Sequence, residues 1–325
     1  MGQESVESQR LILAASTGGH LFELVRQLPF LNAADDSLWI TFKSAQSEEL
    51  LAGRRVLHVP YVRPRDYRGV LRTMRVMRGV LRREHFDGAV STGSAIALGV
   101  LPVARLAGIP ATYIESVCRV EGPSTTGRVL AATHAAQMRT QHPSWAGKQW
   151  HLQQSILATY AQRGRERSCE VGRIFVTLGT IRGYRFDSLI DAVLASGLAN
   201  ENTVWQLGET TGRIDLPGQV HQYLTPQEFA RASKAADVVV THAGVGTLLG
   251  LLDLGIYPVL VVRRAERGEH VDNHQAQIAD LVNSLGIGSA VEVAQLTASV
   301  ISGAAQREIV NSDAVSKFDE LMRSA

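Results

Sequence analysis

A histidine that follows two glycines stands shortly after the first apolar run of the chain. The run Leu11–Ala15 leads into Gly18-Gly19-His20 and on into an amphipathic segment. A strand, a glycine turn and a helix start present backbone N–H groups and the positive end of a helix dipole to an anion. A tight strand-to-helix turn can also need glycine for purely structural reasons. Because imidazole titrates near neutrality, His20 is suited in addition to general-base chemistry.

A similar arrangement returns in the second half of the chain. The run Val238–Val240 precedes THAGVGT, residues 241–247, and a helix is predicted directly after it. Gly244 and Gly246 let the backbone approach a diphosphate, and the Thr247 hydroxyl can add a hydrogen bond at the helix N-terminus. The segment lacks the Lys-Ser/Thr ending of a P-loop and the spacing of a dinucleotide fingerprint. It is therefore either a phosphate site or an ordinary helix-capping turn.

A long polar loop, residues 263–275, follows the buried run Pro258–Val262. Its last four residues carry groups that suit hydrogen bonds to sugar hydroxyls, namely Asp272, Asn273, His274 and Gln275. Arg263 and Arg264 at its start suit an anionic group. A zinc site at His270 and His274 is the rival interpretation. It is disfavoured because i, i+4 spacing serves only on a helix and no Glu-x-x-His context surrounds the pair.

Length and composition indicate a globular protein with room for two domains. The 325 residues are 45% hydrophobic and 20% charged. No apolar stretch of about 18 residues is present, so we expect no transmembrane helix. The polar segment Met1–Gln9 does not resemble a signal peptide. Cys118 and Cys169 match no metal or disulfide framework, which favours free thiols in a reducing cytoplasm.

Short β-type runs alternate with helical stretches, a pattern typical of α/β folds with parallel sheets. The expected strands are Leu11–Ala15, Ser37–Phe42, Val56–Val59, Gly88–Ser91, Ala111–Ile114, Arg173–Leu178, Thr203–Leu207, Gln219–Tyr223, Val238–Thr241, Pro258–Val262 and Ala290–Val293. Between the two series lies a polar stretch, residues 145–170, which we interpret as helical. We therefore expect two doubly wound domains, residues 1–165 and 166–325. Their ligands should lie beyond the carboxyl ends of the strands.

The two expected domains differ in charge. Residues 1–165 hold 20 basic and 12 acidic side chains, and residues 166–325 hold 13 and 19. Five arginines recur three or four residues apart on one predicted helix: Arg68, Arg72, Arg75, Arg78 and Arg82. The apolar side chains Val70, Met74, Met77 and Leu81 form a second face of that helix, suited to packing on a sheet. A basic amphipathic helix favours an anionic membrane surface, whereas nucleic acid is disfavoured because no aromatic platform accompanies the charge.

Several stretches resemble glycosyltransferases of family 28. Three stretches are similar to the nucleotide-sugar-binding C-terminal domain of that family: THAGVGTLLGLLDLGIYPVLVV, DNHQAQIADL and FVTLGTIRGYRFDSLIDAV. Three other stretches are similar to the acceptor subunit of the two-subunit eukaryotic enzyme that acts on dolichol-linked sugar: ASTGGHLFELVRQL, FDGAVSTGSAIALGVLPVARLAGIPATYIESVCRV and STTGRVL. The chain thus looks like both subunits fused, with the resemblance running from about residue 10 to 290. VVRRAERGEHVDNHQ resembles the donor subunit of bacterial exopolysaccharide glucuronosyl- and galactosyltransferases, and the peptidoglycan enzyme MurG is a more distant likeness.

The resemblance implies a GT-B fold, two Rossmann-like domains facing a cleft, and an inverting transfer. A UDP-sugar would bind to residues 166–325, and a polyprenyl-diphosphate-linked sugar to residues 1–165. The enzyme would be cytoplasmic and peripheral on the inner face of the cell membrane, in exopolysaccharide or glycan assembly. Related enzymes also imply that the terminal stretch Asp313–Met322 crosses back to the N-terminal domain.

The resemblance also implies roles for individual residues. His20 is the expected catalytic base and Glu115 its rival, although Glu115 could instead pair with Arg119 at i, i+4 spacing. The expected acceptor-binding residues are Thr17, Gly18, Gly19, Thr92, Gly93 and Ser94. The expected donor-binding residues are Gly179, Thr180, Arg185, Tyr223, Leu224, His242, Gly244, Val245, Gly246, Thr247, Arg263, Arg264, Asp272, Asn273, His274 and Gln275.

No Asp-x-Asp stands where a metal–diphosphate clamp would be expected, so we predict a metal-independent enzyme without a cofactor. Backbone amides at Gly244–Thr247 would stabilise the diphosphate, with Thr180 and either Arg182 or Arg185 opposite.

The same segments lead to an expectation for the donor sugar. A guanidinium at Arg263 or Arg264 could bind a C6 carboxylate in two parallel hydrogen bonds. Gly250 stands where family enzymes carry a ribose-binding glutamate, which removes a negative charge. Both features favour UDP-glucuronic acid, ahead of UDP-galactose, UDP-glucose and UDP-N-acetylglucosamine. In the alternative, the arginines pair with Glu266 and Glu269. A UDP-sugar epimerase and a non-catalytic UDP-sugar-binding protein are the rival classes.

Overall fold

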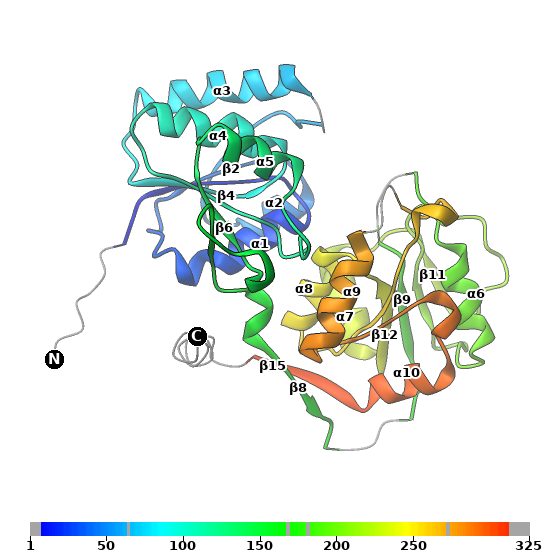
Figure 1. Cartoon of the computed structure of the whole chain (residues 1–325). Helices are drawn as coiled ribbons and strands as arrows, with labels where there is room; N and C mark the ends of the chain where they lie inside the picture. Colours follow the sequence, from blue (N-terminus) through cyan, green and yellow to red (C-terminus); the bar gives the residue numbers. More distant parts are fainter. Residues whose placement is uncertain (1–7, 64–65, 167–169, 180–182, 271–273, 312–325) are drawn as a thin grey trace. The chain divides into compact units, whose positions relative to one another are not determined.

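The chain forms two compact units, Met1–Ile156 and Leu157–Ala325. Figure 1 shows the computed structural model, which describes residues 8–63, 66–166, 170–179, 183–270 and 274–311. The first unit ends before residue 165, where we had expected the boundary. The reason is that β8 (Tyr160–Gly164) pairs antiparallel with β15 (Arg307–Asn311) and so belongs to the second unit.

A seven-stranded parallel sheet forms the centre of the first unit. Its strands are β1 (Leu11–Ala15), β2 (Leu38–Thr41), β3 (Arg55–His58), β4 (Gly88–Gly93), β5 (Ala111–Ile114), β6 (Gln137–Thr140) and β7 (Trp150–Leu152). They lie in the order β3-β2-β1-β4-β5-β6-β7. All five residues of β1 are buried, as expected of a central parallel strand covered on both faces.

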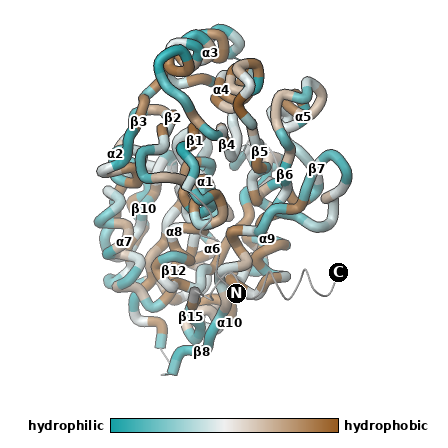
Figure 2. Tube along the Cα trace, turned by 90° about the vertical axis from the view of Figure 1, so that its left-hand side faces the viewer, coloured by the Kyte–Doolittle hydropathy of each residue, from teal (hydrophilic) through white to brown (hydrophobic). Residues whose placement is uncertain are grey.

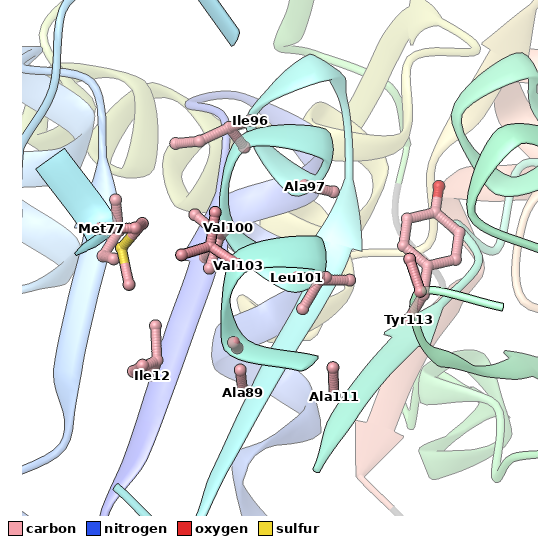
Figure 3. Close-up of a cluster of buried hydrophobic side chains, with 14 of the residues drawn as sticks. Ile12, Met77, Ala89, Ile96, Ala97, Val100, Leu101, Val103, Ala111 and Tyr113 are labelled. Carbon is pink, nitrogen blue, oxygen red and sulfur yellow. The ribbon is translucent and has the colours of Figure 1, made fainter. Parts of the chain in front are cut away.

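Helices cover both faces of this sheet (Figure 1). The helices are α1 (Gly19–Gln27), α2 (Ala45–Leu50), α3 (Tyr67–Leu81), α4 (Ala95–Leu106) and α5 (Thr125–Ala132). Residues of α3, α4 and α5 share one apolar core with the sheet, which includes Ile12, Met77, Val100 and Leu101 (Figure 3). Leu21 and Leu24 of α1 belong to a separate core with β1 and β2. The sheet therefore fixes α1 and α4 on opposite faces.

The second unit repeats this plan with six parallel strands. Its strands are β9 (Ile174–Thr177), β10 (Val204–Gln206), β11 (Gln219–His221), β12 (Val238–His242), β13 (Val259–Val261) and β14 (Ser289–Val291), in the order β11-β10-β9-β12-β13-β14. Its helices are α6 (Asp187–Ala195), α7 (Pro226–Ala235), α8 (Val245–Asp253), α9 (His274–Leu285) and α10 (Ala298–Ala305). Phe229 of α7 and Leu251 of α8 pack on Phe175 and Val239 of the sheet.

Both sheets have the strand order of a Rossmann fold, in which the order reverses beside the first strand of each unit. This reversal lies between β1 and β4 in the first unit and between β9 and β12 in the second. In open parallel sheets, ligands bind where the carboxyl ends of two such strands diverge. The topology therefore predicts one site in each unit, at the loops after these four strands.

The interpretation of residues 145–170 as helical was wrong. This stretch contains β7 and β8 and two short 3-10 turns, Pro143–Trp145 and Ile156–Thr159. Trp150 of β7 is buried against the first core, and the strand that β8 pairs with is β15, far along the chain. These contacts are long-range, so local sequence pattern did not reveal them.

Candidate functional site

The loop after β1 is held by a side chain from the neighbouring helix α2. Gly18 caps α1 with φ of 92°, a conformation that favours glycine, although a Cβ there would meet no atom within 4 Å. The amide of Gln46 accepts a hydrogen bond from the Gly18 N–H (2.6 Å) and donates one to the Gly18 carbonyl (3.2 Å). Sequence reasoning missed Gln46 because its partner is brought close only by the fold.

His20 lies in the first turn of α1 and is fixed to the end of β4. Its Nδ1 is 3.0 Å from the Thr92 carbonyl, and the Thr92 hydroxyl donates to the His20 carbonyl at 2.6 Å. Since a carbonyl can only accept, Nδ1 carries the proton and Nε2 keeps its lone pair. The structure thus brings His20 and Thr92 together and sets the tautomer that a base acting through Nε2 needs.

The imidazole of His20 is neutral at physiological pH. Loss of solvation lowers its pKa to about 4, and the positive charge of Arg119 lowers it further, whereas the hydrogen bond to Thr92 opposes the shift. A neutral ring is the form that can take a proton from an acceptor hydroxyl.

The backbone beside His20 adopts unusual torsion angles. Gly93 has φ of 134°, and a Cβ there would stand 2.7 Å from His20 Cε1. Ser94, which precedes α4, has φ of 70° and ψ of 176°, a region that is almost exclusive to glycine. Strain of this kind costs roughly 1–3 kcal/mol and clusters at ligand-binding positions. The predicted acceptor residues Thr92 and Gly93, at the end of β4, therefore lie against His20, which directly follows the predicted acceptor residues Gly18 and Gly19.

Glu115, the rival base, lies at the end of β5 with a side chain enclosed by hydrogen bonds. Ser124 donates to Oε2 from its N–H (2.8 Å) and its hydroxyl (2.9 Å). Oε1 accepts from the Tyr113 hydroxyl (3.2 Å) and the Ser116 N–H (3.1 Å). The residue is 1% exposed, and burial raises the pKa of its carboxyl despite these donors. The positive charge of Arg119 acts in the opposite direction to burial and favours the ionised carboxyl of Glu115.

A second buried carboxylate, which sequence reasoning missed, ties α1 to the loop after β5. Glu23 Oε1 accepts from the Ser116 hydroxyl (2.6 Å), and Oε2 accepts from the Val117 N–H (3.0 Å). Burial raises the pKa of Glu23 to about 7, and the charge of Glu115 adds to this effect against the hydrogen bonds. Glu23 stands one turn after His20 on α1, so it helps fix the helix that carries the base. A carboxylate on the apolar face of a predicted helix was the feature of the sequence that could have identified Glu23.

In the second unit, His242 lies between two glycines that come from different strands. A Cβ at Gly179 would stand 2.4 Å from His242 Cε1, and one at Gly244 would stand 2.2 Å from Nε2. Only glycine therefore fits at either position. Burial lowers the pKa of His242 to about 3, with further lowering by the charges of Arg263 and His270. The loops after β9 and β12 meet around this neutral imidazole.

The helix α8 begins beside His242 and presents the anion-binding end predicted from the sequence. Gly244 is its N-cap residue, and the first backbone hydrogen bond runs from Leu248 N–H to the Gly244 carbonyl (2.9 Å). The N–H groups of Val245, Gly246 and Thr247 precede that bond, so helix geometry leaves them without partners inside the helix. All three residues are half-buried.

Arg263 does not have the free guanidinium that a uronate clamp requires. The side chain is 1% exposed, and its Nη1 donates to the carbonyls of Glu269 (2.9 Å) and Tyr184 (3.3 Å). Nη2 donates to the Leu178 carbonyl, and the guanidinium carbon lies 4.8 Å from the ring centroid of Phe186. Burial lowers the pKa of Arg263 to about 10. This cation is engaged with the loops after β9 and β13.

Other predicted donor-binding side chains are also paired within the unit. The Arg264 guanidinium donates to Glu292 Oε1 (3.1 Å from Nε), and the Arg264 backbone N–H donates to Glu269 Oε2 (3.0 Å). Arg185 pairs with Asp187 (2.8 Å). Of the two carboxylates expected as alternative partners, Glu269 accepts from the Arg264 backbone N–H, whereas the Arg264 side chain is paired with Glu292. Two further predicted donor-binding residues, Tyr223 and Leu224, follow β11. The Tyr223 hydroxyl donates to Glu209 (2.7 Å), and Leu224 packs on the core.

The polar loop after β13 is partly described. Gln275 is buried in α9, where its Oε1 accepts from the Arg263 N–H (3.3 Å). Thr180, Arg182, Asp272, Asn273, the side chain of His274 and the terminal stretch Asp313–Met322 lie outside the described residues. Among the residues that the structure does describe, no group of three or more His, Cys, Asp or Glu is placed to bind a metal ion. Cys118 is a free thiol, and Cys169 also lies outside the described part.

The arginine helix α3 has the two faces that its sequence predicts. Thr73 and Met77 are buried, and Val70, Met74 and Leu81 pack against the first core. All five arginines are exposed, with Tyr67 (77%) and Leu71 (52%) among the exposed apolar side chains. Hydrophilic and hydrophobic residues accordingly alternate along α3 (Figure 2). In the described part of the chain, none of the helices is both long and apolar enough to span a bilayer.

The chain is similar to known glycosyltransferases over most of its length. Residues 174–320 match the glycosyltransferase family 28 C-terminal domain. The UDP-N-acetylglucosamine--N-acetylmuramyl-(pentapeptide) pyrophosphoryl-undecaprenol N-acetylglucosamine transferase of Synechococcus sp. (strain CC9311) is 27% identical over 88% of this chain and 83% of the relative. The corresponding transferase of Prochlorococcus marinus (strain MIT 9303) is 24% identical over 88% and 82%.

Solved structures support the same fold. Acinetobacter baumannii MurG has a TM-score of 0.55 at 18% identity, covering 96% of this chain and 91% of that one. The spinosyn forosaminyltransferase SpnP has a TM-score of 0.59 at 16% identity, covering 92% and 89%. Two Rossmann-like units with these neighbours define a GT-B fold. The family 28 C-terminal domain and the curated relatives together support a UDP-sugar glycosyltransferase that is similar to family 28, as the sequence motifs indicated.

Proposed function

We propose that the enzyme transfers a sugar, with inversion, from a UDP-sugar to a hydroxyl of a polyprenyl-diphosphate-linked sugar at the cytoplasmic membrane face. The names of the curated relatives support both the nucleotide of the donor and the lipid diphosphate of the acceptor. The observation that carries the chemistry is the neutral His20 ring, whose Nδ1–H is fixed on the Thr92 carbonyl.

In the proposed reaction, His20 is the general base. Its Nε2 accepts the proton of the acceptor hydroxyl while the oxygen attacks the anomeric carbon from the face opposite UDP. The bond from the anomeric carbon to the UDP oxygen breaks, so an α-linked donor yields a β-glycoside. We assign Glu115 a positioning role, since all four of its hydrogen bonds hold the residues around it rather than leaving an oxygen free for substrate.

We also propose that backbone amides, rather than a metal ion, stabilise the leaving diphosphate. The N–H groups at the start of α8 and the glycine-lined loops at Gly179 and Gly244 suit a diphosphate. The absence of an Asp-x-Asp motif supports the same proposal.

For the donor sugar, the contacts of the two arginines remove the main argument for glucuronate. Arg263 is committed to carbonyls, and Arg264 is paired with Glu292. We therefore propose a sugar without a carboxylate, with UDP-N-acetylglucosamine first, as in the named relatives. Gly250 of α8 has no side chain that could hold ribose hydroxyls, so we also propose ribose contacts that differ from those of glutamate-bearing enzymes.

A donor panel tests this proposal. We expect UDP release and lipid-linked product to rise together with a neutral donor, to persist in EDTA, and to be slowest with UDP-glucuronic acid. In competition binding, Arg264→Ala should change the preference between UDP-N-acetylglucosamine and UDP-glucuronic acid by less than about threefold, since a surface ion pair contributes little. A preference for glucuronate that disappears in Arg264→Ala would restore the uronate clamp, and strict metal dependence would contradict the amide site.

Attachment to the membrane is the part of the proposal that α3 supports. Five exposed arginines beside Tyr67 and Leu71 combine charge for anionic headgroups with apolar side chains for the interface. Each arginine close to an anionic surface contributes about 1 kcal/mol.

Replacing Arg68, Arg72, Arg75 and Arg78 by glutamine should therefore abolish most sedimentation with anionic vesicles. High salt should weaken wild-type binding in the same way because it screens surface charge. A variant with the same change in net charge provides the control, in which glutamine replaces Arg105, Arg128, Arg173 and Arg231. Equal binding of wild-type protein to neutral and anionic vesicles would exclude this role for α3.

A further inference from the structure

Arg263 is a buried cation whose side chain reaches main-chain carbonyls rather than a carboxylate. It follows β13 directly, and its three hydrogen-bond partners belong to the loops after β9 and β13. None of the ion pairs among the described residues includes it, because the nearby Glu269 carboxylate binds Ser188, Arg267 and the Arg264 N–H instead. Its Nε–H is also buried and has no partner in the described part of the chain.

A charge buried in this way is costly unless something compensates for it. The carbonyl dipoles and the charge of the nearby Glu269 carboxylate compensate in part, and the negative charges of a bound diphosphate would add to them. The carboxyl edge of this sheet is the place where the proposed function puts a diphosphate. His242, which lies between the loops after β9 and β12, is close enough to Arg263 for the guanidinium to lower its pKa.

The hydrogen bonds of Arg263 also set the direction of a peptide group beside that site. Because the C=O and N–H of a trans peptide point in opposite directions, a Leu178 carbonyl that faces Arg263 turns the Gly179 N–H away from it. Gly179 is buried against His242, and its N–H donates to none of the described residues. A buried N–H without a partner is uncommon and suits an anion.

We propose that Arg263 is a positioning residue for the donor diphosphate, holding the Leu178–Gly179 peptide with its N–H toward the phosphates and adding a buried positive charge behind it. This inference rests on the proposed function, since it assumes a nucleoside diphosphate at this edge. The role differs from that of a sugar clamp, because Arg263 would act through the backbone and its charge without touching the hexose. The two roles can be distinguished because the effect of Arg263 on ligand affinity should depend on the number of phosphates in the ligand.

The test is calorimetric binding of UDP, UMP and uridine to the full chain and to three variants. Arg263→Met removes the charge and the hydrogen bonds, whereas Arg263→Lys keeps the charge but cannot reach three carbonyls in different directions. Arg264→Met is the matched control, with the same change in charge on the neighbouring residue, whose partner is Glu292 at the surface. Thermal unfolding of each variant shows whether the unit stays folded.

We expect Arg263→Met to weaken UDP binding at least 30-fold, UMP binding less, and uridine binding less than twofold. Arg263→Lys should lose part of the UDP affinity, and Arg264→Met should lose less than threefold. Equal losses for UDP and uridine would show a merely structural role and overturn the inference, as would unchanged UDP affinity. If Arg263→Met does not fold, Arg263→Lys decides between these outcomes. Failure of the wild-type protein to bind any of the three ligands would instead overturn the UDP-sugar assignment, and this inference with it.

Discussion

Replacing His20 by alanine is expected to lower kcat by about 10²–10⁴-fold while leaving UDP affinity within twofold. His20 belongs to the first unit, and UDP is proposed to bind the second, so loss of the imidazole should affect chemistry alone. The loss should come mainly in kcat, because the neutral ring acts on the acceptor hydroxyl in the transition state. Steady-state kinetics with a saturating donor and calorimetry with UDP measure the two effects separately.

His85→Ala is the matched control, since it removes an exposed imidazole from the same unit. Glu115→Gln keeps the shape of the enclosed side chain and should cost less than His20→Ala. A near wild-type rate in His20→Ala, together with a loss of 10²-fold or more in Glu115→Gln, would reverse the assignment of the base.

The pH dependence of kcat/KM offers a second check on the same assignment. The folded pKa of His20 is lowered to about 4, so the ring is neutral at higher pH and protonates only as the pH falls through about 4. Activity that depends on His20 should therefore persist well below pH 6.5. An acid limb near pH 7 would instead come from Glu23, whose pKa is raised to about 7, and should disappear in Glu23→Gln.

The central strands and the glycine-bearing loops could be predicted from the sequence because local pattern determines them. The bounds expected for β1 and β5 agree with the structure, since both strands are apolar runs in the middle of a parallel sheet. β6 was missed because Gln137 and Arg139 make its sequence polar, in keeping with its place near the edge of the sheet. β8 and β15 were missed because each requires the other, and they lie more than a hundred residues apart.

The glycines and His20 of the candidate site could likewise be identified from the sequence, but their partners could not. Nothing in the pattern around Arg264 indicates Glu292, which lies 28 residues further along the chain. Side-chain pairings within the same loop were the reasonable expectation, but the fold turns the Arg263 guanidinium onto the carbonyls of Leu178 and Glu269 and leaves the Glu269 carboxylate to Arg267 and the Arg264 N–H. The long-range packing of loops decides such contacts, so the charge of these side chains could not predict which partners they have.

The substitution Gly246→Asp is expected to abolish UDP binding without unfolding the protein. Gly246 is the second residue of α8, where the helix leaves N–H groups free for the proposed diphosphate. A carboxylate there would occupy the space of the phosphates and repel their charge. The same carboxylate interacts favourably with the positive end of the helix dipole, worth roughly 0.3–1 kcal/mol. Stability should therefore hold or rise slightly while binding is lost, a combination that misfolding cannot produce.

Gly303→Asp provides the control, because it adds the same charge to an exposed glycine of α10 where a Cβ meets no atom within 4 Å. We expect this variant to bind UDP as the wild-type protein does. In calorimetry, Gly246→Asp should show a loss of at least 100-fold in UDP affinity, and thermal unfolding should show a melting temperature no lower than that of Gly303→Asp. Undiminished affinity in Gly246→Asp would place the diphosphate elsewhere in the second unit, because a carboxylate and a diphosphate cannot share the start of one helix without a large electrostatic cost.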